Sequence, residues 1–165
     1  MDIYSRENRQ EPTDCIKLRG CLELALLNAK NNAVLASRKI DNVVVTSGRS
    51  YVLSRLVSNA PQTDTINAIA VGTSTTAPLT GDTLLGSEAL RISISSFATS
   101  GLTNNPPSWQ AQATFATNQA NTTLGEAGLF NSTGSNSQTM LSHVTYATIN
   151  KTTSNTLAIS YTISN

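Results

Sequence analysis

Residues 157–163, with the sequence LAISYTI, alternate large apolar side chains with small ones along their whole length. Successive side chains of a β-strand point to opposite faces, so this period of two predicts a strand with one face on a core. The predicted core row is Leu157, Ile159, Tyr161 and Ile163, and the outward row is Ala158, Ser160 and Thr162. The stretch therefore indicates a β-sheet protein that ends in a half-buried strand.

Earlier stretches show the same alternation and are separated by polar loops. One predicted strand places Trp109, Ala111, Ala113 and Phe115 on the core, and another places Leu90, Ile92 and Ile94 there. Residues 66–71 form a short apolar stretch, and residues 72–86 are a long loop rich in Thr, Gly and Pro. Several short strands at this spacing predict a mainly β fold, an antiparallel β-sandwich or barrel-like domain.

The first third of the chain predicts a hairpin followed by one short helix. Residues 21–27 and 33–45 are the expected hairpin strands, joined by a polar turn. Helical spacing of Val52, Leu53, Leu56 and Val57 predicts a helix near 47–58 that packs at one end or face of the sheet. Thr46 or Ser47 is the expected cap at its start.

The N-terminus differs in character from the rest. Residues 1–19 carry eight charges of mixed sign and no apolar periodicity, which predicts an extended N-terminal arm ahead of a β-sandwich domain at 20–165. Its basic residues, candidates for contact with a partner, are Arg6, Arg9, Lys17 and Arg19.

Charge is sparse after residue 55. Only six of the last 110 residues are charged, whereas 47 are Ser, Thr or Asn, and the net charge of the chain is +1. No overall field exists to hold a nucleic acid, so none is expected as a partner. A surface of short polar groups loses little desolvation free energy when buried, which suits packing against neighbours. Thr and Ser also fill the outward faces of ordinary strands, and both interpretations stand.

Membrane, metal and cofactor sites are not expected. The longest apolar stretches fall far short of the ~20 residues that a membrane span needs, and the polar start lacks a secretory signal. We therefore expect a soluble protein that folds in the cytosol where it is made. Cys15 and Cys21 are expected to be free thiols, and two cysteines with the single His143 fall short of a four-ligand zinc site.

The sequence shows no catalytic apparatus, so we expect neither an enzyme nor a small-molecule substrate. The acids Asp64, Asp82, Glu88 and Glu126 are isolated among Thr, Ser and Gly, and salt bridges to Arg91 and Lys151 are their expected fate. A Ser-His-Asp triad would have to use His143, and neither a G-x-S-x-G elbow nor a phosphate-binding glycine loop is present.

Two groups of segments resemble a known domain. The first comprises Ala70–Thr73, Asp82–Leu85 and Glu88–Arg91, and the second comprises Glu126–Phe130, Met140–His143 and Ile149–Thr152 with the strand at 157–163. Together, over roughly residues 43–165, they are similar to a small β-sandwich domain of tailed-bacteriophage virions. That domain is found in capsid decoration (cement) proteins and in tail-fibre and baseplate components.

The resemblance points to a structural motif formed by Glu126, Gly128, Leu129, Phe130 and Lys151. Gly125 and Gly128 would permit a tight or bulged start to a strand, and Leu129-Phe130 would anchor the next segment in the core. Glu126 is expected to pair with Arg91 or Lys151, or else to face solvent.

Size and the arm favour a capsid decoration protein. Fibre and baseplate chains are usually longer, and nineteen extended residues reach about 60 Å at ~3.3 Å each, enough to cross to a neighbouring subunit. The resemblance then implies a homotrimer on the outer capsid surface that binds the major capsid protein and stabilises the shell. The alternative is a tail-fibre or baseplate component that binds a receptor or glycan, for which Trp109 is the residue of interest, and a polysaccharide-degrading enzyme is a third class.

Overall fold

A computed structural model describes residues 17–57, 65–134 and 138–165 of the chain. In these ranges the protein is mainly β, as predicted, with one short α-helix, α1 (Thr46–Ser54), and a 3-10 helix, η1 (Ser100–Thr103). The nine strands in the same ranges are β1 (Arg19–Asn28), β2 (Val34–Val44), β3 (Ala68–Gly72), β4 (Glu88–Ser93), β5 (Ser96–Ala98), β6 (Ser108–Phe115), β7 (Thr123–Phe130), β8 (Met140–Asn150) and β9 (Asn155–Ser164).

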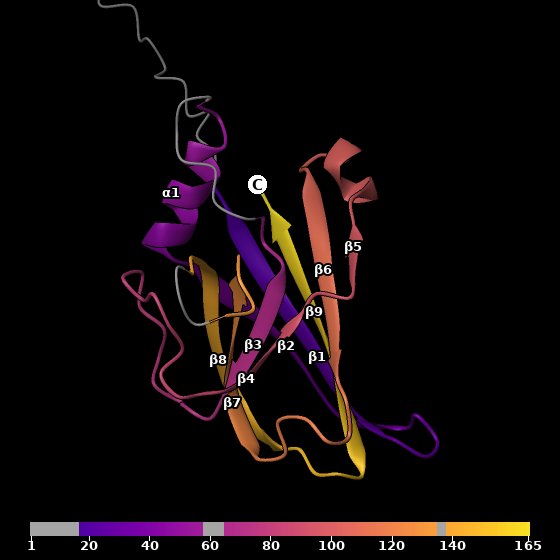
Figure 1. Cartoon of the computed structure of the whole chain (residues 1–165). Coiled ribbons are helices and arrows are strands. Elements are labelled where there is room, and N and C mark those ends of the chain that lie inside the picture. Colours follow the sequence, from indigo (N-terminus) through magenta and orange to yellow (C-terminus); the bar gives the residue numbers. More distant parts are fainter. Residues whose placement is uncertain (1–16, 58–64, 135–137) are drawn as a thin grey trace, which may run out of the picture.

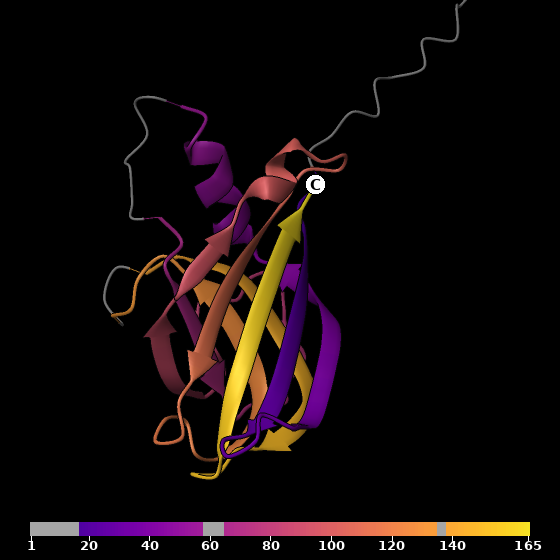
Figure 2. The ribbon, with the colours of Figure 1, turned by 90° about the vertical axis from the view of Figure 1, so that its right-hand side faces the viewer.

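The strands form a curled antiparallel sheet in the order β4-β3-β7-β8-β2-β1-β9-β6-β5. One half contains β2, β1, β9, β6 and β5, and Figure 2 shows it face on, with β9 in yellow. The other half contains β4, β3, β7 and β8 (Figure 1). The two halves enclose the main core, which gives the barrel-like form of the predicted sandwich.

Two segments pass from one half to the other. Most of β2 pairs with β1, but its end, Val43–Val44, pairs with Ser142–His143 of β8. The chain through β4 pairs with β3 and then, two residues later, continues as β5, which pairs with β6. At this crossing the Ile94 N–H donates to the Asn67 carbonyl and the Ser95 N–H to the Gln112 carbonyl, so backbone hydrogen bonds continue from one half to the other.

The core confirms the predicted alternation. Leu157, Ile159, Tyr161 and Ile163 of β9 are buried, as are Ala111, Ala113 and Phe115 of β6. Residues Leu90, Ile92, Ile94 and Trp109 are partly buried and pack against the same cluster. The predicted hairpin is also confirmed, because β1 and β2 pair through register Gly20↔Asn42 to Leu27↔Val34.

A second, smaller apolar cluster lies outside the main core. It consists of Val45, Ala68, Ala70, Leu85, Phe130 and Met140, with Val43 packed against it. Ala68, Ala70, Phe130 and Met140 come from the outer face of the β3-β7-β8 half, Leu85 comes from the long loop between β3 and β4, and Val45 lies between β2 and α1. Since apolar residues pack on both of its faces, β7 is buried along its length after Thr123.

The helix lies where it was predicted. It is shorter than the predicted range 47–58, and it presents a different face to the sheet than the spacing of its apolar residues suggests. It ends at Ser54, and Val45 rather than Thr46 or Ser47 occupies the cap position, without a side-chain cap hydrogen bond. The Ser47 hydroxyl instead donates to the Met140 carbonyl. Gly48 is the buried helix residue, whereas Leu53 is exposed, because the close approach of the helix to β8 uses the glycine.

The boundary of the predicted arm shifts by a few residues. Arg19 is already the first residue of β1, paired with Ser164, and the Lys17 N–H donates to the Asn165 side chain. Leu18 packs against the main core. The β-domain therefore includes Lys17 to Arg19, and residues 1–16 lie outside the described residues.

Candidate functional site

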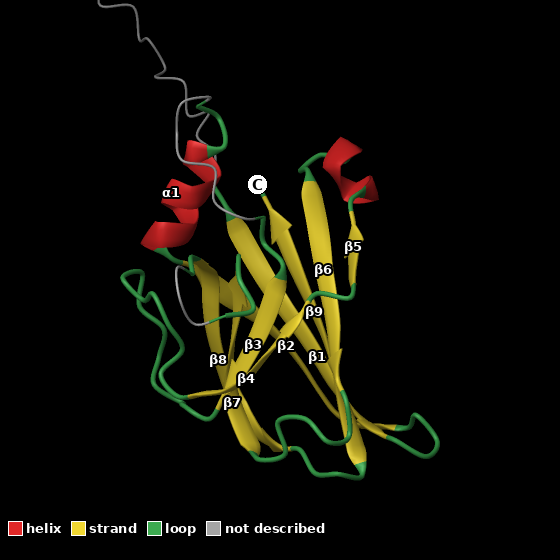
Figure 3. Cartoon of the chain, in the orientation of Figure 1, coloured by secondary structure: helices red, strands yellow, loops and turns green. Residues whose placement is uncertain are grey.

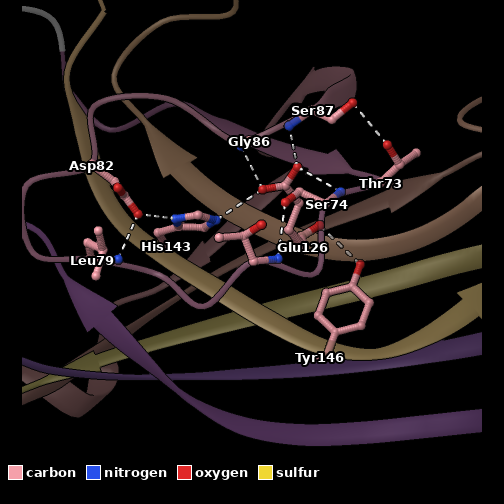
Figure 4. Close-up of polar contacts among 10 residues, drawn as sticks. Thr73, Ser74, Leu79, Asp82, Gly86, Ser87, Glu126, His143 and Tyr146 are labelled. Carbon is pink, nitrogen blue, oxygen red and sulfur yellow. Dashed lines mark hydrogen bonds and ion pairs between the residues drawn. The ribbon is translucent and has the colours of Figure 1, made fainter.

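Glu126 is the centre of an extensive polar network among the described residues. Its side chain is fully buried on β7, and its two carboxylate oxygens accept three backbone N–H groups. Oε1 accepts from Ser87 at 2.7 Å and from Ser74 at 3.2 Å, and Oε2 accepts from Gly86 at 2.8 Å (Figure 4). One carboxylate thus binds both ends of the loop between β3 and β4.

His143 of β8 extends the network to a second acid. Its Nε2 lies 3.1 Å from Glu126 Oε2, and its Nδ1 lies 2.7 Å from Asp82 Oδ2. Asp82 in turn accepts the Leu79 N–H at 2.8 Å (Figure 4). We call Asp82, Glu126 and His143, with the loop N–H groups that they accept, the Glu126 network.

Each ring nitrogen of His143 faces one carboxylate oxygen, so a ring N–H on either side donates to an acid. Partial burial of Asp82 opposes its ionisation, but the Leu79 N–H and the His143 ring together outweigh burial and hold the pKa of Asp82 below its ordinary value. Charge-assisted hydrogen bonds of this kind are the stronger ones in proteins.

Glycine is required where the loop meets the network. A Cβ added to Gly72, the last residue of β3, would collide with the Glu126 carboxylate and the Ser87 carbonyl. At Gly125 an added Cβ would lie 2.8 Å from the Ser74 carbonyl oxygen, and the β7–β8 register shifts between Leu124 and Glu126. This confirms the predicted bulge beside Gly125, and it turns the Glu126 side chain towards the loop.

The geometry of the network suits fixing a loop. Both ring nitrogens of His143 lie against carboxylate oxygens. Both oxygens of Glu126 accept hydrogen bonds from the protein. Within the described ranges, no group of three or more His, Cys, Asp or Glu residues is arranged to hold a metal ion.

The predicted partners of Glu126 are wrong. Arg91 instead pairs with Glu88 at 2.6 Å and donates to Gln138 and the Ser132 carbonyl, and its guanidinium lies 3.7 Å from the centre of the Phe130 ring. The expectation that Glu126 faces solvent is also wrong, since none of it is exposed. Loop N–H groups and His143 satisfy the carboxylate in place of a basic side chain.

Lys151 is buried at a separate place. Its Nζ donates to the Ala116 carbonyl at 2.7 Å and to Asn121 Oδ1 at 3.0 Å, both in the loop between β6 and β7. Burial lowers the pKa of Lys151. Lys151 therefore holds the β6–β7 loop just as Glu126 holds the β3–β4 loop.

The remaining motif residues lie on β7 with Glu126. Gly128, Leu129 and Phe130 are buried, with Leu129 in the main core and Phe130 in the second cluster. Phe130 therefore anchors the outer layer rather than the sandwich core, while Leu129 anchors the core as predicted. Phe130 is also the ring on which Arg91 stacks.

The basic residues proposed for the arm are divided by the structure. Lys17 and Arg19 are exposed at the end of the barrel that also carries the C-terminus, whereas Arg6 and Arg9 lie outside the described residues. Cys21 is a free thiol, and burial raises its pKa. Cys15 also lies outside the described residues.

Sequence reasoning missed the roles of His143 and Asp82. His143 lies on β8, and no sequence pattern indicates that its side chain faces the loop rather than the core. One signal in the sequence could have linked these residues. Asp82, His143 and Glu126 all lie in the segments that carry the resemblance, and Asp82 is in the middle of a polar loop.

Comparison of the chain with protein-family models, curated proteins and solved structures finds no match. No helix within the described ranges has both the length and the apolar character needed to cross a membrane. Function must therefore be argued from the residues and the fold.

Proposed function

We propose that this chain is a non-enzymatic virion protein that binds the outer surface of a tailed-phage capsid as a trimer. In this role it contacts the major capsid protein and stabilises the shell by bridging neighbouring capsid subunits. The proposal requires a rigid β-domain, a surface that is inexpensive to bury, and a tether.

The observation that supports the proposal is that the separate segments of the resemblance meet in one polar network. Asp82 belongs to the first group of segments, and Glu126 and His143 belong to the second. The Glu126 network joins them directly (Figure 4). Residues that were recognised by sequence alone thus have a common physical task, which supports their origin in one type of domain.

The outward rows of β9 and β6 support self-association, although Glu23 on the neighbouring β1 is charged. On β9 the row is Thr156, Ala158, Ser160, Thr162 and Ser164, none of which is charged. On β6 the adjacent row is Gln110, Gln112 and Thr114, and Gln110 donates to Thr162 across the strands. Burying such short polar groups costs little desolvation free energy compared with burying charges.

The position of the arm supports tethering. Lys17 and Arg19 are exposed where the chain enters β1, and Arg6 and Arg9 precede them. Exposed ion pairs contribute only about 0–1 kcal/mol each, so a single arm would bind weakly. Three arms on one trimer would act together through their high effective concentration.

The experiment compares the full chain with a chain that begins at Lys17, using shells of the cognate major capsid protein that lack this component. We expect the full chain to co-sediment with the shells and to raise the temperature at which they rupture. The truncated chain is expected to lose most of that binding. The double variant Arg6→Gln/Arg9→Gln should lose less, because it keeps the rest of the arm.

Two outcomes would contradict the proposal. A full chain that neither binds nor stabilises the shells removes the capsid role, and specific retention on a glycan array would then support the tail-fibre alternative. Native mass spectrometry that shows only monomer at micromolar concentration removes the trimer.

A further inference from the structure

A hollow lies on the outer face of the sheet half that Figure 2 shows face on. It has a volume of about 580 Å³ and is lined by residues of β2, β1, β9 and β6 and by Ser95, which lies between β4 and β5. Figure 3 shows both helices at one end of the strands, and neither of them contributes a residue to the lining. Every residue that lines the hollow is among those that the structure describes. The hollow is therefore a property of the sheet surface.

A row of short side chains crosses the hollow. The register aligns one such side chain from each of four neighbouring strands: Ser37, Ala25, Ala158 and Thr114. They alternate along their strands with core residues such as Ile159, so they face outward. Short side chains lose little conformational entropy on burial, and they allow a second protein surface to approach the sheet closely.

The next row across the hollow contains a buried hydroxyl group beside an ion pair. The register aligns Lys39, Glu23, Ser160 and Gln112 across the same four strands, and all four residues line the hollow. The hydroxyl oxygen of Ser160 is buried, and it has no hydrogen-bond partner among the described residues. Since buried polar atoms in proteins usually have a partner, this hydroxyl is available to a second molecule that enters the hollow.

The charges of this face match those of a second copy. Lys39 Nζ lies 2.6 Å from Glu23 Oε1, and their side chains are 73% and 49% exposed. A base directly beside an acid is complementary to the same pair on another copy, because each Lys39 can meet the Glu23 of that copy. Arg38, the other charged residue of the lining, donates to the Ser37 carbonyl. None of the lining residues is aromatic, whereas pockets for small molecules are mostly lined by apolar and aromatic side chains.

We propose that the hollow is a contact surface between copies of this chain, in which Lys39 of each copy pairs with Glu23 of a neighbouring copy. The inference rests on the self-association in the proposed function, and it names the contact that provides it. Ala158 and Thr114 belong both to the hollow and to the outward rows of β9 and β6, so one contact buries both. Because the acid and the base lie side by side, partners can be exchanged in a ring of three copies as well as in a pair.

A double charge reversal, Glu23→Lys/Lys39→Glu, tests the exchange of partners. The reversed chain keeps opposite charges within each copy and between its own copies, so it should associate as strongly as the wild type. Contacts between wild type and reversed chain would place Lys against Lys and Glu against Glu, which strongly disfavours them. We therefore expect isotope-labelled wild type and unlabelled reversed chain, mixed and left to exchange, to form separate oligomers in native mass spectrometry. The control mixture of labelled and unlabelled wild type should form mixed oligomers.

Ala158→Arg tests the hollow itself, because a long side chain would fill it. Ala158 is partly exposed on the outer face, so the fold should be retained, which the circular dichroism spectrum checks. The dissociation constant of the oligomer should rise by about tenfold or more in analytical ultracentrifugation. The matched control is Thr123→Arg, at an exposed strand position that does not line the hollow, and it should leave the dissociation constant unchanged.

Three results would overturn the proposal. Statistical mixing of wild type and reversed chain means that the ion pair acts only within one chain, even though the copies associate. An oligomer that Ala158→Arg leaves intact assigns the self-contact to another face, and weaker co-sedimentation of that variant with shells would assign the hollow to the capsid protein. Wild-type chains that stay monomeric remove the self-association of the proposed function together with this contact, which separates that failure from the first two.

Discussion

Glu126 shows how a buried acid is stabilised without a basic side chain. Removing a carboxylate from water is costly, and the cost is offset here by three backbone N–H donors and one imidazole ring. Those donors come from Ser74, Gly86 and Ser87, so the same bonds that solvate the acid hold the loop on the sheet. The charge and the loop conformation therefore depend on each other.

Glu126→Gln is expected to destabilise the protein by about 2–4 kcal/mol, because the amide places an NH₂ group against buried donors. The free energy of unfolding in urea measures the loss. Glu23→Gln is the matched control, since Glu23 is half exposed in its ion pair with Lys39 and should contribute only about 0–1 kcal/mol. Equal losses in the two variants would mean that Glu126 has no special role.

The lowered pKa of Asp82 predicts how the free energy of unfolding changes with pH in the acid range. Its pKa in the folded state is lower than in the unfolded chain, where carboxyls of this type titrate near ~3.9. Its contribution is therefore complete above that value and is lost as pH falls through the folded-state pKa. In urea unfolding at several pH values, the stability gap between wild type and Asp82→Asn should narrow below about pH 4. A gap that stays constant down to the lowest pH would exclude this linkage.

At the scale of elements, the β3–β4 loop behaves as a third layer on the sheet. It contributes Leu85 to the second apolar cluster, and it contributes backbone N–H groups that donate to Glu126 in the polar network. This layer contributes to the burial of the outer face of β7. The loop is therefore part of the fold even though it contains neither helix nor strand.

Gly72→Ala tests the close packing of this layer. An added methyl group would meet the Glu126 carboxylate and the Ser87 carbonyl, and overpacking of this kind costs about 1–3 kcal/mol. Gly81→Ala, in the same loop, is the control, because an added Cβ there meets no atom within 4 Å. Its effect should lie between none and a gain of about 1 kcal/mol. Thermal unfolding of the two variants in parallel provides the measurement.

The helix shows where the sequence pattern stops being informative. Helical spacing of Val52, Leu53, Leu56 and Val57 correctly placed a helix after the hairpin, but it indicated a buried apolar face. In the structure Gly48 makes the close contact with β8, and Leu53 points to solvent. Periodicity reports that an apolar face exists, and it does not report whether the rest of the chain covers that face.

At the scale of the whole molecule, the sequence predicted the strands better than it predicted the partners of the buried polar side chains. Alternation in residues 157–163 identified β9 and its buried row, because burial on one face leaves a period of two in the sequence. The contacts of the candidate site were harder to predict from the sequence. Glu126 and Lys151 were recognised as important, yet their partners were assigned by charge, whereas backbone N–H and carbonyl groups, which leave no trace in the sequence, satisfy most of their hydrogen bonds.

The pairing of the two ends of the chain has its own consequence. β1 and β9 lie side by side near the middle of the sheet order and pair over their full lengths, from Arg19↔Ser164 to Asn28↔Asn155. Closing the sheet therefore requires both ends of the described chain.

Truncation at successive residues tests where the folded domain begins. A chain that starts at Lys17 keeps the Lys17–Asn165 hydrogen bond, the packing of Leu18 and the Arg19–Ser164 pair, so its thermal midpoint should lie within about 2–4 °C of the full chain, the size of a ~1 kcal/mol change. A chain that starts at Gly20 loses all three, and its midpoint should fall further, by several degrees. Circular dichroism melts of the full chain and the two truncated chains give the comparison. If both truncated chains melt together with the full chain, Lys17 to Arg19 belong to the arm, and the domain boundary lies at residue 20 after all.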